Sequence, residues 1–114
     1  MEFATWAYPW DLRDEGVDAV SSRLREIGIT EVNLATNYHA VQAFSPHDTG
    51  RKTHFARASS YFFPDDRYGD LRPTPYEGMD CDWVESITTK TEDLQLTSWT
   101  VGCHNSRLGM AHPE

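Results

Sequence analysis

Aromatic, amide and imidazole side chains gather at the ends of three short apolar runs, residues 3–8, 32–36 and 96–101. The residues concerned are Trp6, Tyr8, Trp10, Asn37, Tyr38, His39, Trp99, His104, Asn105 and Arg107. Sugars present an apolar CH face and a rim of hydroxyls, which aromatic faces beside hydrogen-bonding side chains can match. We therefore predict that these ten residues bind a carbohydrate. For each aromatic residue, a purely structural place in the core of a small sheet is the alternative.

The carboxylates supply no catalytic pair. Hydrolysis of a glycosidic bond normally needs two carboxyl groups, roughly 5 to 10 Å apart. Asp65 and Asp66 are neighbours in a predicted turn, and Asp80 and Asp82 fit the start of a helix as caps. Asp11 ends the first apolar run, where a barrel active site would use a carboxylate, but helix capping explains it better. We therefore assign no catalytic residue.

The sequence also lacks the residue spacing that is typical of metal sites and nucleotide sites. Seven side chains could ligate a soft or borderline metal ion: His39, His47, His54, His104, His112, Cys81 and Cys103. They form neither CxxC nor HxxxH, and the phosphate-binding patterns GxGxxG and GxxxxGK are absent from the sequence. We therefore expect no metal site and no cofactor.

The composition disfavours nucleic acids and membranes as partners. The 114 residues suffice for one domain, and the net charge of -8 comes without any basic patch that could hold phosphates. Eight arginines stand against two lysines. An acidic, lysine-poor surface suits a protein kept soluble at high salt, but an ordinary acidic cytosolic protein has the same composition.

Cysteine usage and the amino-terminal residues predict a cytoplasmic protein. Cys81 and Cys103 are too few for a disulfide framework. The residues after Met1 have neither a positive region nor an unbroken apolar stretch, and no segment is long and apolar enough to span a bilayer.

The first third of the chain predicts a strand, a helix and a second strand. Residues 3–8 form the first strand, and Asp11 or Asp14 caps the helix, which ends before Gly28. The apolar positions at helical spacing are Val17, Val20, Leu24 and Ile27. The second strand follows at 29–36, and a βαβ unit of this length makes the two strands parallel, with a right-handed crossover.

Residues 45–78 form a long loop in this interpretation. Prolines and glycines interrupt it throughout, and only residues 59–63 suggest a short strand. A disordered insertion is the alternative, but six aromatic residues argue against it: Phe55, Tyr61, Phe62, Phe63, Tyr68 and Tyr76. We expect the loop to fold back over another part of the protein.

A second helix and a third strand complete the predicted elements. The helix begins near Asp80 or Asp82, and the strand begins at Gln95. The apolar positions of this helix are Trp83, Val84, Ile87 and Leu94. The fold class is therefore α/β, with about three parallel strands, two helices and a long loop.

Four stretches carry a resemblance to a known group of proteins. They are WAYPWDL at 6–12, LATNYHAVQA at 34–43, SWTV at 98–101 and HNSRLG at 104–109. On these residues the chain resembles the amino-terminal part of uncharacterised (β/α)8-barrel (TIM barrel) proteins that are similar to glycoside hydrolases. The resemblance implies that residues 1–114 form a single incomplete barrel domain, because a complete barrel takes about 250 residues and eight strands.

An incomplete barrel implies a binding role without catalysis. The catalytic carboxylates would lie on later strands, so the fragment would supply carbohydrate-binding surface and the isolated chain would be inactive. Its open strand edges would associate with a second copy or with the missing remainder. Two other functions stay open: a noncatalytic acidic α/β interaction module, and a fragment of a metal-dependent barrel isomerase or aldolase.

Overall fold

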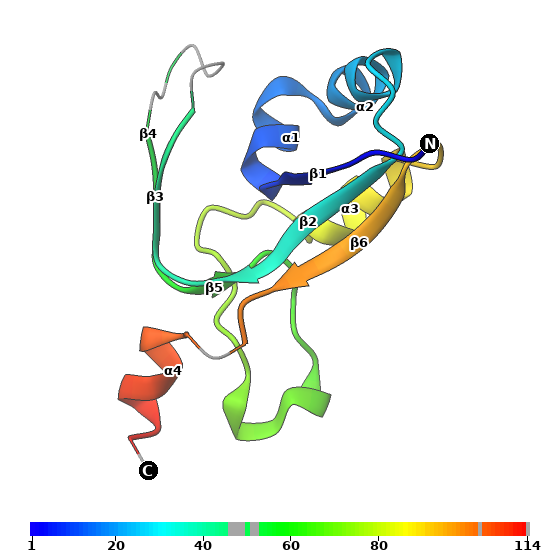
Figure 1. Ribbon diagram of the computed structural model, residues 1–114. Coiled ribbons are helices and arrows are strands. Elements are labelled where there is room, and N and C mark those ends of the chain that lie inside the picture. Colours follow the sequence, from blue (N-terminus) through cyan, green and yellow to red (C-terminus); the bar gives the residue numbers. More distant parts are fainter. Residues whose placement is uncertain (46–49, 51–52, 103, 114) are drawn as a thin grey trace.

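Three parallel strands organise the chain (Figure 1). In the computed structural model, which describes residues 1–45, 50, 53–102 and 104–113, strand β2 (Glu31–Tyr38) lies between β1 (Ala4–Ala7) and β6 (Gln95–Thr100). Both neighbours run parallel to β2, as the sequence predicts. The short strand β5 (Ser59–Ser60) pairs antiparallel with the end of β2. The fold is therefore mixed α/β, and β1, β2, β5 and β6 form one sheet.

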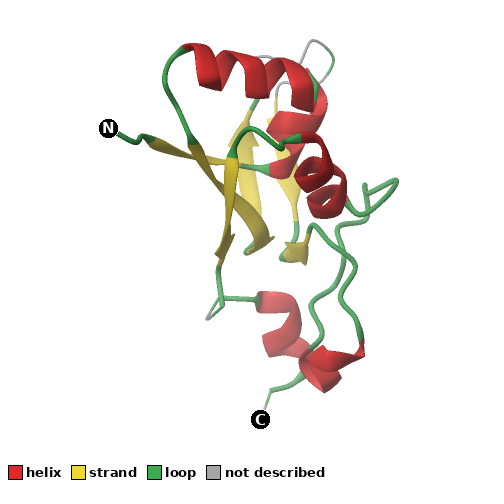
Figure 2. Ribbon diagram, turned by 90° about the vertical axis from the view of Figure 1, so that its right-hand side faces the viewer, coloured by secondary structure: helices red, strands yellow, loops and turns green. Residues whose placement is uncertain are grey.

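Three helices cover one face of this sheet (Figure 2). They are α1 (Pro9–Glu15), α2 (Val17–Glu26) and α3 (Trp83–Lys90). Their apolar side chains pack on alternate residues of the strands, in a cluster made of Leu12, Val17, Leu34 and Ile87 with Ala7, Val20, Val84 and Leu96. The other face carries the intervening residues, and Trp6 on that face is 66% exposed. One face of the sheet is therefore covered by helices. The other is open at Trp6, whereas Ala35 near its carboxyl end is completely buried among aromatic rings.

The first helical region differs from its prediction at both ends. It begins at Pro9, directly after β1, with Tyr8 as the N-cap. Neither α1 nor α2 has a capping side chain, so the prediction of Asp11 or Asp14 as a cap is wrong, and Asp11 lies in the first turn of α1. Gly16, at φ +94°, divides the two helices. Proline suits a first helical turn, so the helix can start without a capping side chain.

The carboxyl end of α2 is only partly as predicted. Gly28 follows the helix with φ +89°, and its N–H donates to the carbonyl of Arg25 while that of Ile29 donates to Leu24. This is the Schellman arrangement that the glycine predicts. Ile27, expected on the buried side, is 73% exposed because it lies past the last helical turn.

The segment from 45 to 78 has more regular structure than expected. Strands β3 (Val41–Phe44) and β4 (Thr53–Ala56) form an antiparallel hairpin, and a 3-10 helix, η1, spans Asp66–Leu71. Of the predicted strand at 59–63, only β5 is present. The expectation that this segment folds back is confirmed, because His54 and Tyr61 are fully buried against the rest of the fold.

The second half follows the sequence closely up to the end of β6. Asp82 caps α3 by accepting from the N–H of Glu85, and β6 begins at Gln95, as predicted. Leu94 is buried but lies beyond α3, which ends at Lys90. The sequence interpretation missed a last helix, α4 (Ser106–Ala111), which lies past the carboxyl end of β6 (Figure 1).

Two expectations from the sequence concern the cellular compartment of the protein. Among the described residues no helix is both long enough and apolar enough to cross a membrane. Cys81 is a free thiol, and Cys103 lies outside the described residues.

The end of α2 generates a test of the fold. We expect Gly28→Ala to lower the free energy of unfolding by about 1 kcal/mol, because a Cβ is strained at this positive φ. Gly109→Ala is the matched control: this glycine lies inside α4 with open space around it, and we expect no loss of stability there. Urea denaturation measures both. Equal stability of the wild type and Gly28→Ala would contradict the assigned cap.

Candidate functional site

Aromatic rings from the carboxyl ends of all three parallel strands lie in contact. Tyr8 directly follows β1, Tyr38 ends β2 and Trp99 lies near the end of β6. The Tyr8 ring centroid lies 5.3 Å from that of Tyr38 and 6.0 Å from that of Trp99, and Tyr38 and Trp99 are 5.0 Å apart. Parallel strands in register place their ends at one edge, which explains why residues so distant in sequence meet.

Two imidazoles extend this ring group. The His39 ring lies 4.2 Å from Tyr38, and the His104 ring lies 5.4 Å from His39. His39 Nδ1 lies 2.6 Å from the carbonyl oxygen of Ala40, so Nδ1 carries the proton and donates it. We call Tyr8, Tyr38, His39, Trp99 and His104 the strand-end ring group. It combines flat apolar faces with polar edges.

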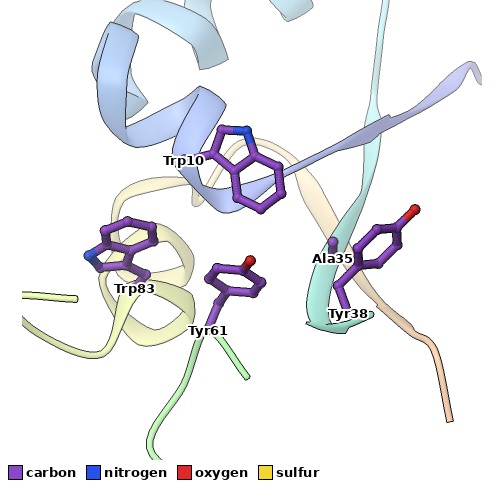
Figure 3. Close-up of a cluster of buried hydrophobic side chains, with 5 residues drawn as sticks. All are labelled: Trp10, Ala35, Tyr38, Tyr61 and Trp83. Carbon is purple, nitrogen blue, oxygen red and sulfur yellow. The ribbon is translucent and has the colours of Figure 1, made fainter. Parts of the chain in front are cut away.

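Trp10 supports this group from within the protein. Its side chain is completely buried and stacks on Tyr8 at 4.3 Å and on His54 at 4.0 Å. Figure 3 shows Trp10 above Tyr61, with Trp83 on the left and with Ala35 and Tyr38 of β2 on the right. A ring enclosed in this way offers no free face to a ligand. Trp10 is therefore a core residue, which is the alternative to a binding role.

The remaining predicted site residues lie apart from the ring group or serve local structure. Trp6 is exposed and makes no ring contact within the described part of the chain. Asn105 caps α4 by accepting from the N–H of Leu108. Arg107 reaches 3.2 Å from Glu77 and 3.5 Å from the carbonyl of Ala58, which fastens α4 to the long segment.

Asn37 is the tenth predicted residue. Its Nδ2 donates to the carbonyl of Val101 at 3.5 Å, while its Oδ1 is buried and has no hydrogen-bond partner among the described residues. Asn37 therefore links the ends of β2 and β6, beside the ring group.

Burial changes the acidity of two tyrosines in this region. Desolvation, with a hydrogen bond from the Tyr8 hydroxyl to that of Tyr38 at 3.3 Å, raises the pKa of Tyr8 to about 12. Burial also raises the pKa of Tyr61, whose hydroxyl has no partner in the described structure. Both phenols are therefore neutral at physiological pH and can act only as hydrogen-bonding groups.

The described carboxylates that the sequence singled out have structural partners. Hydrogen bonds from Trp83 Nε1 at 2.9 Å, helped by the nearby Arg13 guanidinium, lower the pKa of Asp80. Asp65 accepts from the N–H and side chain of Arg67, which lowers its pKa as well. Carboxylates with lowered pKa values are poor general acids.

The sequence interpretation did not connect two buried aromatic residues and one partly buried one with the site. His54, Tyr61 and Tyr76 come from the long segment and join Trp10 to Trp83 through ring contacts of 4.0 to 6.1 Å. The signal was the aromatic content of that segment, which indicated folding back but not the place of contact.

Neither a search for metal ligands nor comparison with known proteins assigns a function to this site. Within the described residues no group of three or more His, Cys, Asp or Glu side chains could hold a metal ion, and His47 and Cys103 lie outside them. No protein-family model, curated protein or solved structure matches this chain.

The hydroxyl of Tyr61 generates a stability test. Burying a hydroxyl without a partner is costly, so we expect Tyr61→Phe to raise the free energy of unfolding by about 1 kcal/mol at pH 7. Above pH 10 the unfolded tyrosine ionises while the buried one, with its raised pKa, stays protonated, so the wild type loses stability as pH rises. The Tyr61→Phe variant should lose less stability over the same rise in pH.

Urea denaturation at neutral pH and between pH 9 and 11 measures both effects. Tyr68→Phe is the control, because the ring of Tyr68 is 45% exposed and its hydroxyl removal should change stability little. A destabilised Tyr61→Phe at pH 7 would show that this hydroxyl has a partner after all.

Proposed function

We propose that the chain contributes carbohydrate-binding surface to a (β/α)8-type barrel similar to glycoside hydrolases, with the strand-end ring group as its binding surface. The observation that carries the proposal is the meeting of Tyr8, Tyr38 and Trp99 at the carboxyl ends of three parallel strands. This is where barrel enzymes bind their substrates. A sugar ring can stack on an aromatic face while the His39 and His104 edges bond to its rim.

The layering of the sheet supports a barrel. Helices α1, α2 and α3 share one face, as the outer helices of a barrel do. The opposite face is open at Trp6, as a barrel interior would be before further strands close it. In a longer assembly, strands from a second copy or from a remainder of the protein would pair with the free edges of β1 and β6.

Catalysis is not part of this proposal for the isolated chain. Asp65, Asp80 and Asp82 are engaged in capping, ion pairs and hydrogen bonds. An acid and a base for glycoside hydrolysis would come from further strands.

Binding is tested with three soluble oligosaccharides, cellohexaose, xylohexaose and maltohexaose, by calorimetry. We expect at least one of them to bind, and Trp99→Ala to weaken that binding by about tenfold through loss of a stacking surface. Phe44→Ala removes a more exposed aromatic side chain from the hairpin and should leave the affinity unchanged.

Circular dichroism confirms that each variant is folded. Absence of binding by the folded wild type to all three sugars would refute the proposal, as would equal losses in Trp99→Ala and Phe44→Ala.

A noncatalytic interaction module is the second candidate, and the open sheet face favours it. Trp6 is 66% exposed on this face, Phe3 just before β1 is 51% exposed, and among the described residues β1 and β6 each pair only with β2. Exposed apolar residues beside unpaired strand edges are typical of surfaces that pair with another chain. The partner of this candidate is a strand of a second copy.

Self-association tests this second candidate. We expect sedimentation velocity to show a larger species as the protein concentration rises, and Trp6→Glu to shift the chain toward the monomer. Ile27→Glu is the control, because Ile27 is similarly exposed but lies next to α2, away from the open face. A wild type that stays monomeric at every concentration would exclude this candidate.

A further inference from the structure

Three hydroxyl groups cluster on the helix side of the sheet, opposite Trp99. Ser98 and Thr100 flank Trp99 in β6, so their side chains point to the other face. The Thr36 hydroxyl lies 2.6 Å from that of Ser98 and 3.1 Å from that of Thr100, and the last two are 3.3 Å apart. We call these three residues the hydroxyl triad.

A register shift produces the triad. Up to Ala35 the strands β2 and β6 pair residue by residue, but Asn37 pairs with Thr100, so Thr36 has no opposite residue. Such a bulge changes the direction of a side chain at the end of a pairing. It brings the Thr36 hydroxyl within hydrogen-bonding distance of two residues of β6.

The hydroxyl triad forms one wall of a hollow of about 340 Å³. The hollow is lined by Thr36, Asn37, Phe62, Tyr68, Pro73, Val84, Ser98 and Thr100. The rings of Phe62 and Tyr68, 5.9 Å apart, supply an apolar wall. A second hollow of about 370 Å³ shares Asn37, Tyr68 and Pro73 and continues toward α4. Each volume lies in the range of small-molecule sites.

The polar groups of this groove mainly offer acceptors. Three hydroxyls in mutual contact can place all three protons in bonds to one another, which leaves a free lone pair on each oxygen. A matching ligand therefore carries several O–H donors.

The charge of the groove limits the ligand further. Among the described residues that line the two hollows there is no Asp, Glu, Lys or Arg. An ionised ligand would lose its hydration without gaining a counter-charge, which is unfavourable. A neutral ligand has no such cost.

We infer that this groove is a separate binding site for a neutral polyhydroxylated ring of one or two sugar units. The ring hydroxyls donate to the hydroxyl triad, and the apolar ring face packs on Phe62 and Tyr68. This site uses residues other than the strand-end ring group and lies on the opposite face of the sheet, so it stands even if that group binds nothing.

The probes are methyl β-glucoside and cellobiose, with glucuronate as the charged counterpart, followed by NMR. We expect the neutral probes to shift the Thr36 and Thr100 methyl signals and the Tyr68 ring signals, and glucuronate to bind much more weakly. Thr100→Val keeps the shape but removes one exposed acceptor, so the affinity for cellobiose should fall about fivefold.

Thr97→Val is the matched control. Thr97 lies on the same strand, but its side chain is on the open face and bonds to Glu31, so the affinity should not change. Trp99→Ala separates the two sites, because it should weaken binding at the strand-end ring group about tenfold and leave the ligand-induced Thr100 and Tyr68 shifts intact.

Three results would overturn the inference. They are absence of any shift at the hydroxyl triad with both neutral probes, equal affinity for glucuronate, and an unchanged affinity in a folded Thr100→Val variant. Oligosaccharide binding that survives Thr100→Val but fails in Trp99→Ala would remove the groove and leave the proposed function standing.

Discussion

The burial of Trp10 is the contact on which the arrangement of the other parts depends. Its ring stacks on Tyr8 at one side and on His54 at the other, and Tyr61 lies 5.4 Å away. It thereby joins the end of β1 to the hairpin and to β5, which are some fifty residues further along the chain. Burying so large a ring supplies part of the free energy that offsets the cost of ordering the long segment around it.

The alternation of side chains along the strands separates two chemistries within a few residues. In β6, Trp99 faces the ring group, whereas Ser98 and Thr100 face the groove. The bulge in β2 places the Thr36 hydroxyl in the groove, although Ala35 and Tyr38 beside it pack with the aromatic rings. A single strand end can thus serve two surfaces, one aromatic and one rich in hydroxyls.

Local signals predicted much of the sheet and less of what surrounds it. The parallel strands, Gly28 after α2 and the Asp82 cap follow from periodicity and from preferences of single residues. The hairpin β3–β4 escaped prediction because its strands are short and its inward side is defined by contacts with distant rings. The capping role of Asp11 was wrong because Pro9 starts α1 earlier.

The sequence by itself determined the parallel order of the strands and the collection of aromatic residues at their ends, because both depend on the spacing of neighbours along the chain. Only the tertiary structure decided which rings remain accessible. Trp6 and Trp10 are only four residues apart in the sequence, yet Trp10 is enclosed and Trp6 is 66% exposed. The physical reason is that burial depends on partners such as His54 and Tyr61, whose approach no local pattern records.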